Sequence, residues 1–317
     1  MKRNKKNIFI TGVNGFIGKN LCNYLTKKNY NVYGIDNFYS SDPEDLKKIN
    51  SKYLYFKKKS ILEDDIFKDA PFSIDVVFHL AAQTSVSKSI SNPKENNVLN
   101  IDGFKNILDL SIKNNVSKFF FASSCAVYGD TNNLPCKESQ KNLYPNSPYA
   151  ESKLFNEYYS EKFASKKINI IGLRLFNIYG PMQNRKSQYA AVISKWLYLM
   201  NKNKRLIIYG DGNSKRDFCH VDDLCILFEK IIHKKNISGI FNFCTGKPCS
   251  INELYSIFYS IVSKNRKFKM EISPLYKTKR EGEIKLSYGD NSFLKSNLNF
   301  RPKIKLREGI KGLINAL

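Results

Sequence analysis

The sequence predicts an α/β protein with a doubly wound parallel sheet and a smaller α/β lobe. Three observations predict this class. Short apolar runs alternate with helix-forming stretches from the N-terminus to about residue 176. A glycine-rich turn joins the first apolar run to the first helix, and polar residues follow several later runs. Because parallel strands need a crossover between them, this alternation favours a sheet with helices on both faces.

Each expected strand is short and apolar, whereas the expected helices are longer and amphipathic. The expected strands are NIFIT (7–11), NVYGID (31–36), KYLYFK (52–57), DVVFHLA (75–81), KFFFAS (118–123) and INIIGLRLF (168–176). The expected helices cover 16–28, about 96–113 and 148–165. After about residue 176 the alternation breaks, and segments such as GPMQNRKSQYAAVISKW and TKREGEIKLSYGD predict the smaller, irregular lobe.

The turn TGVNGFIG carries Gly12, Gly15 and Gly18 between the first strand and the first helix. Glycines at this spacing let backbone N–H groups and a helix N-terminus approach a pyrophosphate. We therefore expect residues 1–176 to form a dinucleotide-binding Rossmann domain, with a returning segment near 214–245. Residues 177–317 should then form mainly a substrate-binding lobe.

Asp36 ends the second expected strand, 18 residues after Gly18. A carboxylate at this offset can accept hydrogen bonds from the adenosine ribose hydroxyls. It would repel the additional phosphate of NADP, and the following NFYSS offers no Arg or Lys to receive that phosphate. The predicted cofactor is therefore NAD.

The stretch SPYAESK places Tyr149 and Lys153 one turn apart on an expected helix. Ser147 suits the N-cap and Pro148 the first helical position. A nearby ammonium and the positive end of the helix dipole both favour phenolate, so we expect the pKa of Tyr149 to fall toward neutrality. The pair alone would also suit an ordinary solvated helix, so its context decides its meaning.

Bulk composition excludes several classes of protein. No run approaches the 18 or so apolar residues of a membrane span, and the basic N-terminus lacks a signal-peptide pattern, which predicts a cytoplasmic protein without a membrane partner. Seven Cys with no Cys-x-x-Cys pair indicate free thiols and no metal site. The net charge of +24 could indicate nucleic-acid binding, but the basic residues are spread along the chain, which favours a solvated surface and no nucleic-acid partner.

Together, the motifs resemble the extended short-chain dehydrogenase/reductase family, in its nucleotide-sugar 4-epimerase branch. The resemblance covers nearly the whole chain and is strongest to UDP-N-acetylglucosamine 4-epimerases and UDP-glucose 4-epimerases. It implies an isomerase with tightly bound NAD, a UDP-sugar substrate and a homodimer. The motifs are TGVNGFIG, DNF, HLAAQTSVSKS, SSCAVYGD, SPYAESK, RLFNIYGP and SKRDF.

The resemblance implies that Ser124, Tyr149 and Lys153 form the catalytic triad, with Lys153 also holding the nicotinamide ribose. Ser60 stands where the family usually has an acidic residue, so the adenine contact is expected to be weaker. The implied cofactor-binding positions are Gly12, Gly15, Phe16, Ile17, Gly18, Asp36, Asn37, Ser60, Ile61, Leu80, Ala81, Ala82, Asn100, Tyr149, Lys153 and Phe176.

The resemblance places the UDP-sugar against Arg side chains that can pair with a diphosphate and against a small residue that leaves room for an acetamido group. Glu283 stands where relatives usually have Asp. Thr84 and Gln188 replace smaller residues of some relatives and would narrow the pocket. The implied substrate positions are Ser124, Tyr149, Asn177, Gln183, Val192, Tyr209, Arg216, Arg280, Glu283 and Ser287.

Other functions stay open at this point. A 4,6-dehydratase or a sugar-acid decarboxylase would need acidic groups after Ser124, where this chain has Cys125 and Ala126. A UDP-glucose-specific 4-epimerase and a catalytically silent NAD-binding or RNA-binding protein are the remaining alternatives. The expected reaction is epimerisation at carbon 4 of UDP-N-acetylglucosamine and UDP-N-acetylgalactosamine, with UDP-glucose and UDP-galactose as further substrates.

Overall fold

The computed structural model describes the chain in five stretches and divides it into two compact units. The described residues are 5–163, 168–183, 191–264, 273–279 and 284–317. The first unit comprises Met1–Val127, Pro145–Arg174 and Cys225–Phe241, and the second comprises Tyr128–Tyr144, Leu175–Leu224 and Asn242–Leu317.

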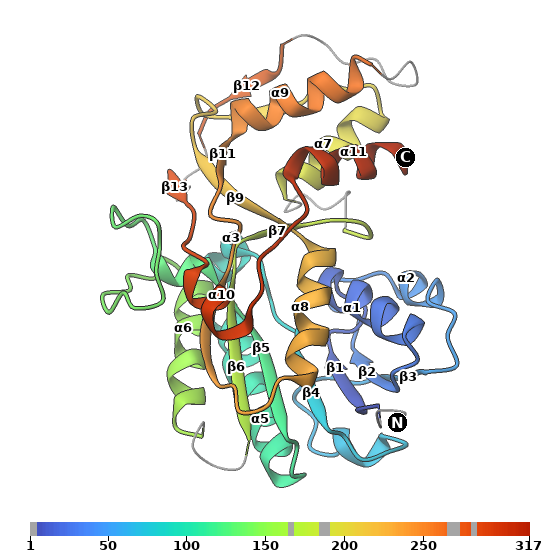
Figure 1. The fold of residues 1–317 in the computed structure, drawn as a ribbon. Helices are drawn as coiled ribbons and strands as arrows, with labels where there is room; N and C mark the ends of the chain where they lie inside the picture. The colour runs from blue at the N-terminus through green and yellow to red at the C-terminus, as the bar shows by residue number, and fades with distance from the viewer. Residues whose placement is uncertain (1–4, 164–167, 184–190, 265–272, 280–283) are drawn as a thin grey trace. The chain divides into compact units, whose positions relative to one another are not determined.

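A seven-stranded sheet in the order β10-β6-β5-β4-β1-β2-β3 forms the centre of the first unit (Figure 1). Ile8 of β1 pairs in parallel with Val32 of β2 and with Val76 of β4. This order changes direction at β1 and β4, which is where α/β sheets bind dinucleotides. The strands are β1 (Ile8–Thr11), β2 (Val32–Asp36), β3 (Leu54–Lys58), β4 (Val76–His79), β5 (Lys118–Ser124), β6 (Asn169–Leu175) and β10 (Gly239–Phe243).

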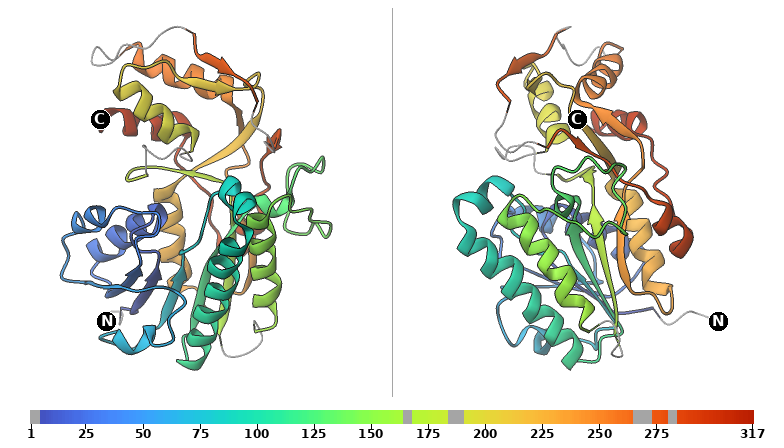
Figure 2. Two further views of the ribbon diagram at one scale, coloured as in Figure 1. Left: turned by 180° about the vertical axis from the view of Figure 1, so that it is seen from behind. Right: turned by 90° about the vertical axis from the view of Figure 1, so that its left-hand side faces the viewer.

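Helices cover both faces of this sheet (Figure 2). Neighbouring phenylalanines of β5 show why: Phe119 and Phe121 contact Phe104 of α5, whereas Phe120 contacts Phe228 of α8. Alternate side chains of a strand point to opposite faces, so one aromatic run anchors helices on both sides. The predicted doubly wound α/β class is therefore confirmed. The helices are α1 (Phe16–Lys27), α2 (Pro43–Lys47), α3 (Val86–Ser91), α4 (Pro93–Asn97), α5 (Gly103–Lys113), α6 (Pro148–Glu161) and α8 (Val221–His233), with short turns at Ile66–Asp69 and Cys125–Tyr128.

The helix expected over about 96–113 is not regular. A π-helical turn (Val98–Asp102) separates α4 from α5. The chain is helical over the whole expected range, and only the π-helical turn was not predicted, because the spacing of apolar residues does not reveal a local change in backbone hydrogen bonding. Such turns are frequent at functional sites.

The second unit is built on smaller sheets and its own hydrophobic core. Trp196, Leu254, Phe258 and Ile310 are among the residues that pack together in that core. In the described part of the chain, every helix is too short or too polar to span a bilayer. The elements are β7 (Asn177–Tyr179), α7 (Val192–Asn201), β8 (Ile207–Tyr209), β9 (Lys215–His220), β11 (Pro248–Ser250), α9 (Ile251–Val262), β12 (Leu275–Lys277), β13 (Leu286–Ser287), α10 (Ser292–Leu298) and α11 (Leu306–Asn315).

Candidate active site

The glycine-rich turn brings the ends of β1 and β4 into contact. Gly12 has φ +67°, and a Cβ at this position would lie 2.8 Å from the backbone Cα and N of Ala81. The backbone N of Leu80 also donates to the carbonyl of Thr11. The predicted cofactor residues Gly12 and Leu80–Ala82 are thus neighbours, and only glycine allows that approach.

The N-terminus of α1 is suited to a phosphate group. Gly15 occupies its N-cap without a side-chain cap, and Phe16 and Ile17 form its first turn. A Cβ on Gly18 would lie 2.1 Å from the carbonyl oxygen of Gly12, so the helix packs directly against the turn. Because no N-cap side chain accepts hydrogen bonds from the first backbone N–H groups of α1, these groups can donate to the pyrophosphate of a dinucleotide.

Asp36 ends β2 as predicted and is held in a fixed orientation. Its Oδ2 accepts from the backbone N of Asn14 at 3.0 Å, and its Oδ1 accepts from the backbone N of Phe38 at 2.7 Å. The carboxylate therefore lies beside the glycine turn, where a ribose would follow a pyrophosphate. The next predicted residue, Asn37, is exposed.

The turn at Ser60, which the resemblance predicts to contact adenine, contains an acidic group that the sequence analysis did not consider. Ser60 lacks the expected carboxylate, but Glu63 Oε1 accepts from the Ser60 backbone N at 2.6 Å. Ile61 is buried, and a Cβ on Gly103 would lie 2.3 Å from its Cδ1. The Glu63 carboxylate therefore lies beside Ser60, the position at which the family pattern has an acidic residue and this chain does not.

Asn100 lies in the π-helical turn at the centre of a buried amide network. Its Oδ1 accepts from the Gln83 backbone N, and its Nδ2 donates to Gln83 O, Asn96 Oδ1 and Ser152 Oγ. The network joins the segment after β4 to α6, the helix that carries Tyr149. Asn100 is therefore placed as part of the scaffold around the predicted cofactor site.

The first unit brings the three predicted catalytic residues together. Ser147 caps α6 by accepting from the backbone N of Ala150, and Pro148 is the first helical residue, as predicted. Lys153 Nζ lies 5.8 Å from the centre of the Tyr149 ring and donates to the carbonyl of Ala122 at 2.9 Å. A hydrogen bond also joins Ser124 to Tyr149.

The expected pKa of Tyr149 was wrong in direction. Burial raises the pKa of Tyr149 to about 12, while the hydrogen bond with Ser124 acts to lower it and Cys125 adds to the rise. Burial also lowers the pKa of Lys153 to about 8. The sequence argument counted the neighbouring charge but could not weigh desolvation, which penalises both ionised forms.

In the second unit, three predicted substrate residues lie along β9. Asn177 of β7 pairs with Phe218, and Ser287 of β13 pairs with Arg216. Arg216 Nη1 donates to the carbonyls of Lys215 and Lys285. The structure thus places Ser287 next to an Arg that the sequence analysis assigned to diphosphate binding.

The remaining predicted substrate residues are more scattered. Gln183 is half-buried; its Nε2 donates to Ile178 O at 3.4 Å, and its Oε1 is buried without a hydrogen-bond partner among the described residues. Val192 packs against the core of the second unit. Tyr209 pairs with Lys277. Phe176, predicted to contact the cofactor, is buried with its ring beside Gly289. Gln188, Arg280 and Glu283 lie outside the described residues.

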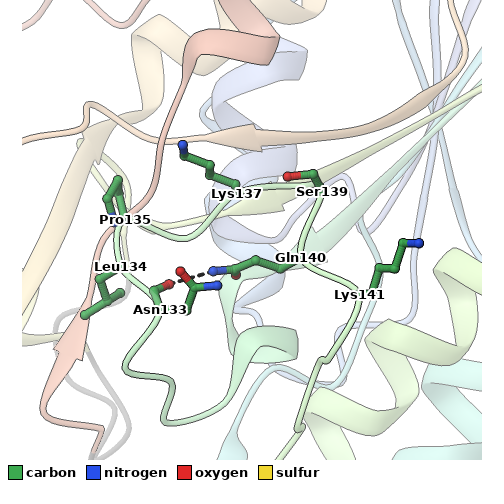
Figure 3. A pocket seen from close by; sticks show the side chains of 7 residues that line it. All are labelled: Asn133, Leu134, Pro135, Lys137, Ser139, Gln140 and Lys141. Carbon is green, nitrogen blue, oxygen red and sulfur yellow. Dashed lines mark hydrogen bonds between the residues drawn. The ribbon is translucent and has the colours of Figure 1, made fainter.

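A surface hollow in the second unit does not coincide with any predicted site residue (Figure 3). It is formed by the loop around Pro135, and Gln140 Nε2 donates to the carbonyl of Asn133 at 2.6 Å within it. We assign this hollow no role, because its lining offers exposed loop side chains and no convergent reactive groups. The lining residues are Asn133, Leu134, Pro135, Lys137, Ser139, Gln140 and Lys141.

The sequence analysis also missed Thr11 and His79 at the ends of β1 and β4. Thr11 Oγ1 lies 2.9 Å from His79 Nδ1 and accepts from the backbone N of Ala81. Burial, with a smaller contribution from Lys153, lowers the pKa of His79 to about 3, so the imidazole is neutral. A polar residue at the end of each of two apolar strands was the available signal.

The chain belongs to the NAD dependent epimerase/dehydratase family, whose model matches residues 8–244. The site geometry agrees with this family, because the glycine turn at Gly12, the uncapped N-terminus of α1 and the carboxylate of Asp36 at the end of β2 fit NAD. The protein is therefore an NAD-dependent enzyme. In the described residues, no group of three or more His, Cys, Asp or Glu side chains could hold a metal ion.

Three relatives bear names of sugar epimerases. A UDP-N-acetylglucosamine 4-epimerase from Methanobrevibacter ruminantium, solved with UDP-N-acetylmuramic acid, is 34% identical with a TM-score of 0.88 over 99% of each chain. A UDP-glucose 4-epimerase from Thermotoga maritima, solved with UDP-glucose, is 31% identical with a TM-score of 0.88 over 98% of this chain and 97% of that one. A UDP-glucuronate 4-epimerase from Thermodesulfobacterium geofontis is 32% identical over 96% of this chain and 94% of its own.

Proposed function

We propose that the protein inverts carbon 4 of a UDP-hexose and that its preferred pair is UDP-N-acetylglucosamine and UDP-N-acetylgalactosamine. The observation that supports a 4-epimerase most directly is the arrangement of Ser124, Tyr149 and Lys153 in one unit with the glycine turn. The relatives act on acetamido, plain and acidic sugars, so the sugar is argued from this chain's own residues.

NAD, when bound, supplies the acceptor and later the donor of one hydride. Tyr149 takes the proton from the 4-hydroxyl and returns it to that same oxygen once carbon 4 has presented its other face. Ser124 orients the reacting oxygen through the hydroxyl that also bonds Tyr149. Lys153, fixed to the carbonyl of Ala122, places a positive charge beside the phenol and favours its ionised form.

Cys125 and Ala126 argue against elimination chemistry. A dehydratase needs an acid and a base besides the tyrosine, and neither a thiol nor a methyl group supplies the acid–base pair expected after Ser124. Epimerisation needs no further group, because the same proton and hydride return to the sugar. We therefore expect neither net loss of water nor consumption of NAD.

The acetamido preference depends on Ser287. It is small, half-buried and paired with Arg216, so it leaves space beside a residue proposed to hold the diphosphate. Plain hexoses would fit the same space with fewer contacts. We propose UDP-glucose and UDP-galactose as the second substrate pair and a homodimer as the functional assembly, which size-exclusion chromatography with light scattering would test.

The decisive experiment incubates the protein separately with UDP-N-acetylglucosamine, UDP-glucose and UDP-glucuronate and resolves the products by chromatography. We expect the 4-epimers of the first two substrates, with the faster turnover on the acetamido sugar. A 4-keto-6-deoxy product would show a dehydratase, and absence of any product would contradict the proposed function.

A further inference from the structure

Three residues on one face of α6 bond three successive residues at the end of β5. Tyr149 bonds Ser124, Lys153 Nζ donates to the carbonyl of Ala122, and Glu157 Oε1 accepts from Ser123 Oγ at 2.5 Å. Residues four apart share a helix face, so the helix presents 149, 153 and 157 in one row. The proposed chemistry uses only the first two of these contacts and leaves the third unexplained.

Glu157 is held from the other side by Arg174 of β6. Arg174 Nη2 lies 2.7 Å from Glu157 Oε2, and its Nε donates to Oε1 at 3.0 Å. Glu157 and Ser123 are each 2% exposed, and Arg174 is 5% exposed. A two-point contact of this kind fixes the carboxylate plane, which in turn fixes the direction of the Ser123 hydroxyl.

The ion pair is a poor candidate for a purely stabilising element. Taking both charges out of water offsets much of their attraction, and apolar replacements of buried pairs are often neutral or stabilising. Besides any contribution to stability, the ion pair fixes the orientation of the Glu157 carboxylate and, through it, of the Ser123 hydroxyl. Ser123 directly precedes Ser124, so a shift of the Ser123 side chain would also move the Ser124 hydroxyl.

We propose that Glu157, oriented by Arg174, is a positioning residue that holds the end of β5 through Ser123 so that the Ser124 hydroxyl stays directed at Tyr149. This inference rests on the proposed function, because its effect is read in the carbon-4 reaction. Glu157 itself does not touch substrate or cofactor in this role.

Ser123→Ala tests the proposal while leaving the ion pair intact, since Glu157 Oε1 keeps its bond from Arg174. We expect kcat to fall about tenfold with KM and NAD content unchanged, because small displacements of a positioned group lower the chemical step. Ser123→Thr, which keeps the hydroxyl, should restore most of the rate. The matched control is Ser111→Ala, another buried serine in this unit, whose hydroxyl donates to the carbonyl of Ile107 on α5.

Two further readouts separate positioning from stability. In a Ser124→Ala background, adding Ser123→Ala should change kcat by less than about twofold, which is the scatter seen for independent mutations. The reason is that Ser123 acts through the Ser124 hydroxyl, which this background lacks. The acid limb of the kcat/KM profile of Ser123→Ala should also move to higher pH, because the Ser124 bond that lowers the pKa of Tyr149 is weakened.

A Ser123→Ala variant with the kcat of the Ser111→Ala control would overturn the proposal, as would an equal loss in the Ser124→Ala background. A lower melting temperature with an unchanged kcat and pH profile would show a structural role only and overturn it too. Either result leaves the proposed function intact. If the unaltered protein turns over no UDP-sugar, the proposed function fails and this inference fails with it.

Discussion

In the first unit, Asp36 and Ser124 stand at the ends of strands of five and seven residues. Tyr149 and Lys153 stand on α6, and Lys153 bonds this helix to β5. In the second unit, Asn177, Tyr209 and Ser287 stand on strands of three, three and two residues, whereas Arg216 stands on the six-residue β9. A long buried sheet fixes geometry, whereas short strands tolerate exchange of side chains. We propose from this comparison that the first unit determines the reaction and the second unit determines the sugar preference.

The largest expected effect is loss of the phenol in the first unit. Tyr149→Phe should lower kcat by about 10³-fold, because proton transfer by a positioned side chain contributes roughly 10²–10⁴-fold. The NAD content should stay unchanged. Turnover is measured by chromatography of UDP-sugars, and the control is Tyr158→Phe, a tyrosine on the same helix that is 53% exposed. Similar turnover in both variants would remove Tyr149 from the mechanism.

A second large effect is expected at the cofactor turn. In Gly12→Ala, the new Cβ would meet the Ala81 backbone at 2.8 Å and strain a residue with φ +67°. The turn must therefore move away from β4, and we expect affinity for NAD to fall by about 10²-fold because a displacement of about 1 Å is that costly. The NAD content of the purified protein, released by denaturation and read by absorbance, measures this. A normal content would show that the close contact with Ala81 is not needed.

The second unit should respond with a change of preference instead. Ser287→Tyr should lower activity on UDP-N-acetylglucosamine by about 10–10²-fold, because an added ring overfills the space proposed for the acetamido group. Activity on UDP-glucose should persist. The ratio of kcat/KM for the two substrates is the measurement, with Ser256→Tyr on the exposed side of α9 as control. Parallel loss of both activities would remove Ser287 as the determinant of sugar preference.

Much of the first unit could be predicted because its signals are local. Gly12, Asp36 and the Ser147 cap each lie within a short segment whose pattern carries its own physical meaning. The pKa of Tyr149 could not be predicted, since it depends on burial by residues far away in sequence. The contact between Glu157 and Arg174 likewise joins two elements, and no periodicity reports it.

In the second unit the sequence could predict fewer positions from physics alone. Asn177, Arg216 and Ser287 came from motif resemblance, and only the pairing of β7 and β13 with β9 shows that they lie along one strand. Short strands have too few residues for a clear alternation. Their assignments to substrate remain proposals.

The smallest expected effect contrasts a glycine of the second unit with Gly12. Gly312 lies in α11, is exposed, and a Cβ added there would meet nothing within 4 Å. Ala is favoured over Gly in a helix interior by about 0.8–1.0 kcal/mol, so Gly312→Ala should raise the free energy of unfolding by close to that amount. Denaturant unfolding with unchanged m-value measures it, and NAD content and turnover should match the unaltered protein. A loss of stability would mean that α11 needs this glycine for a contact, and the contrast between a required glycine in the first unit and a replaceable one in the second would fail.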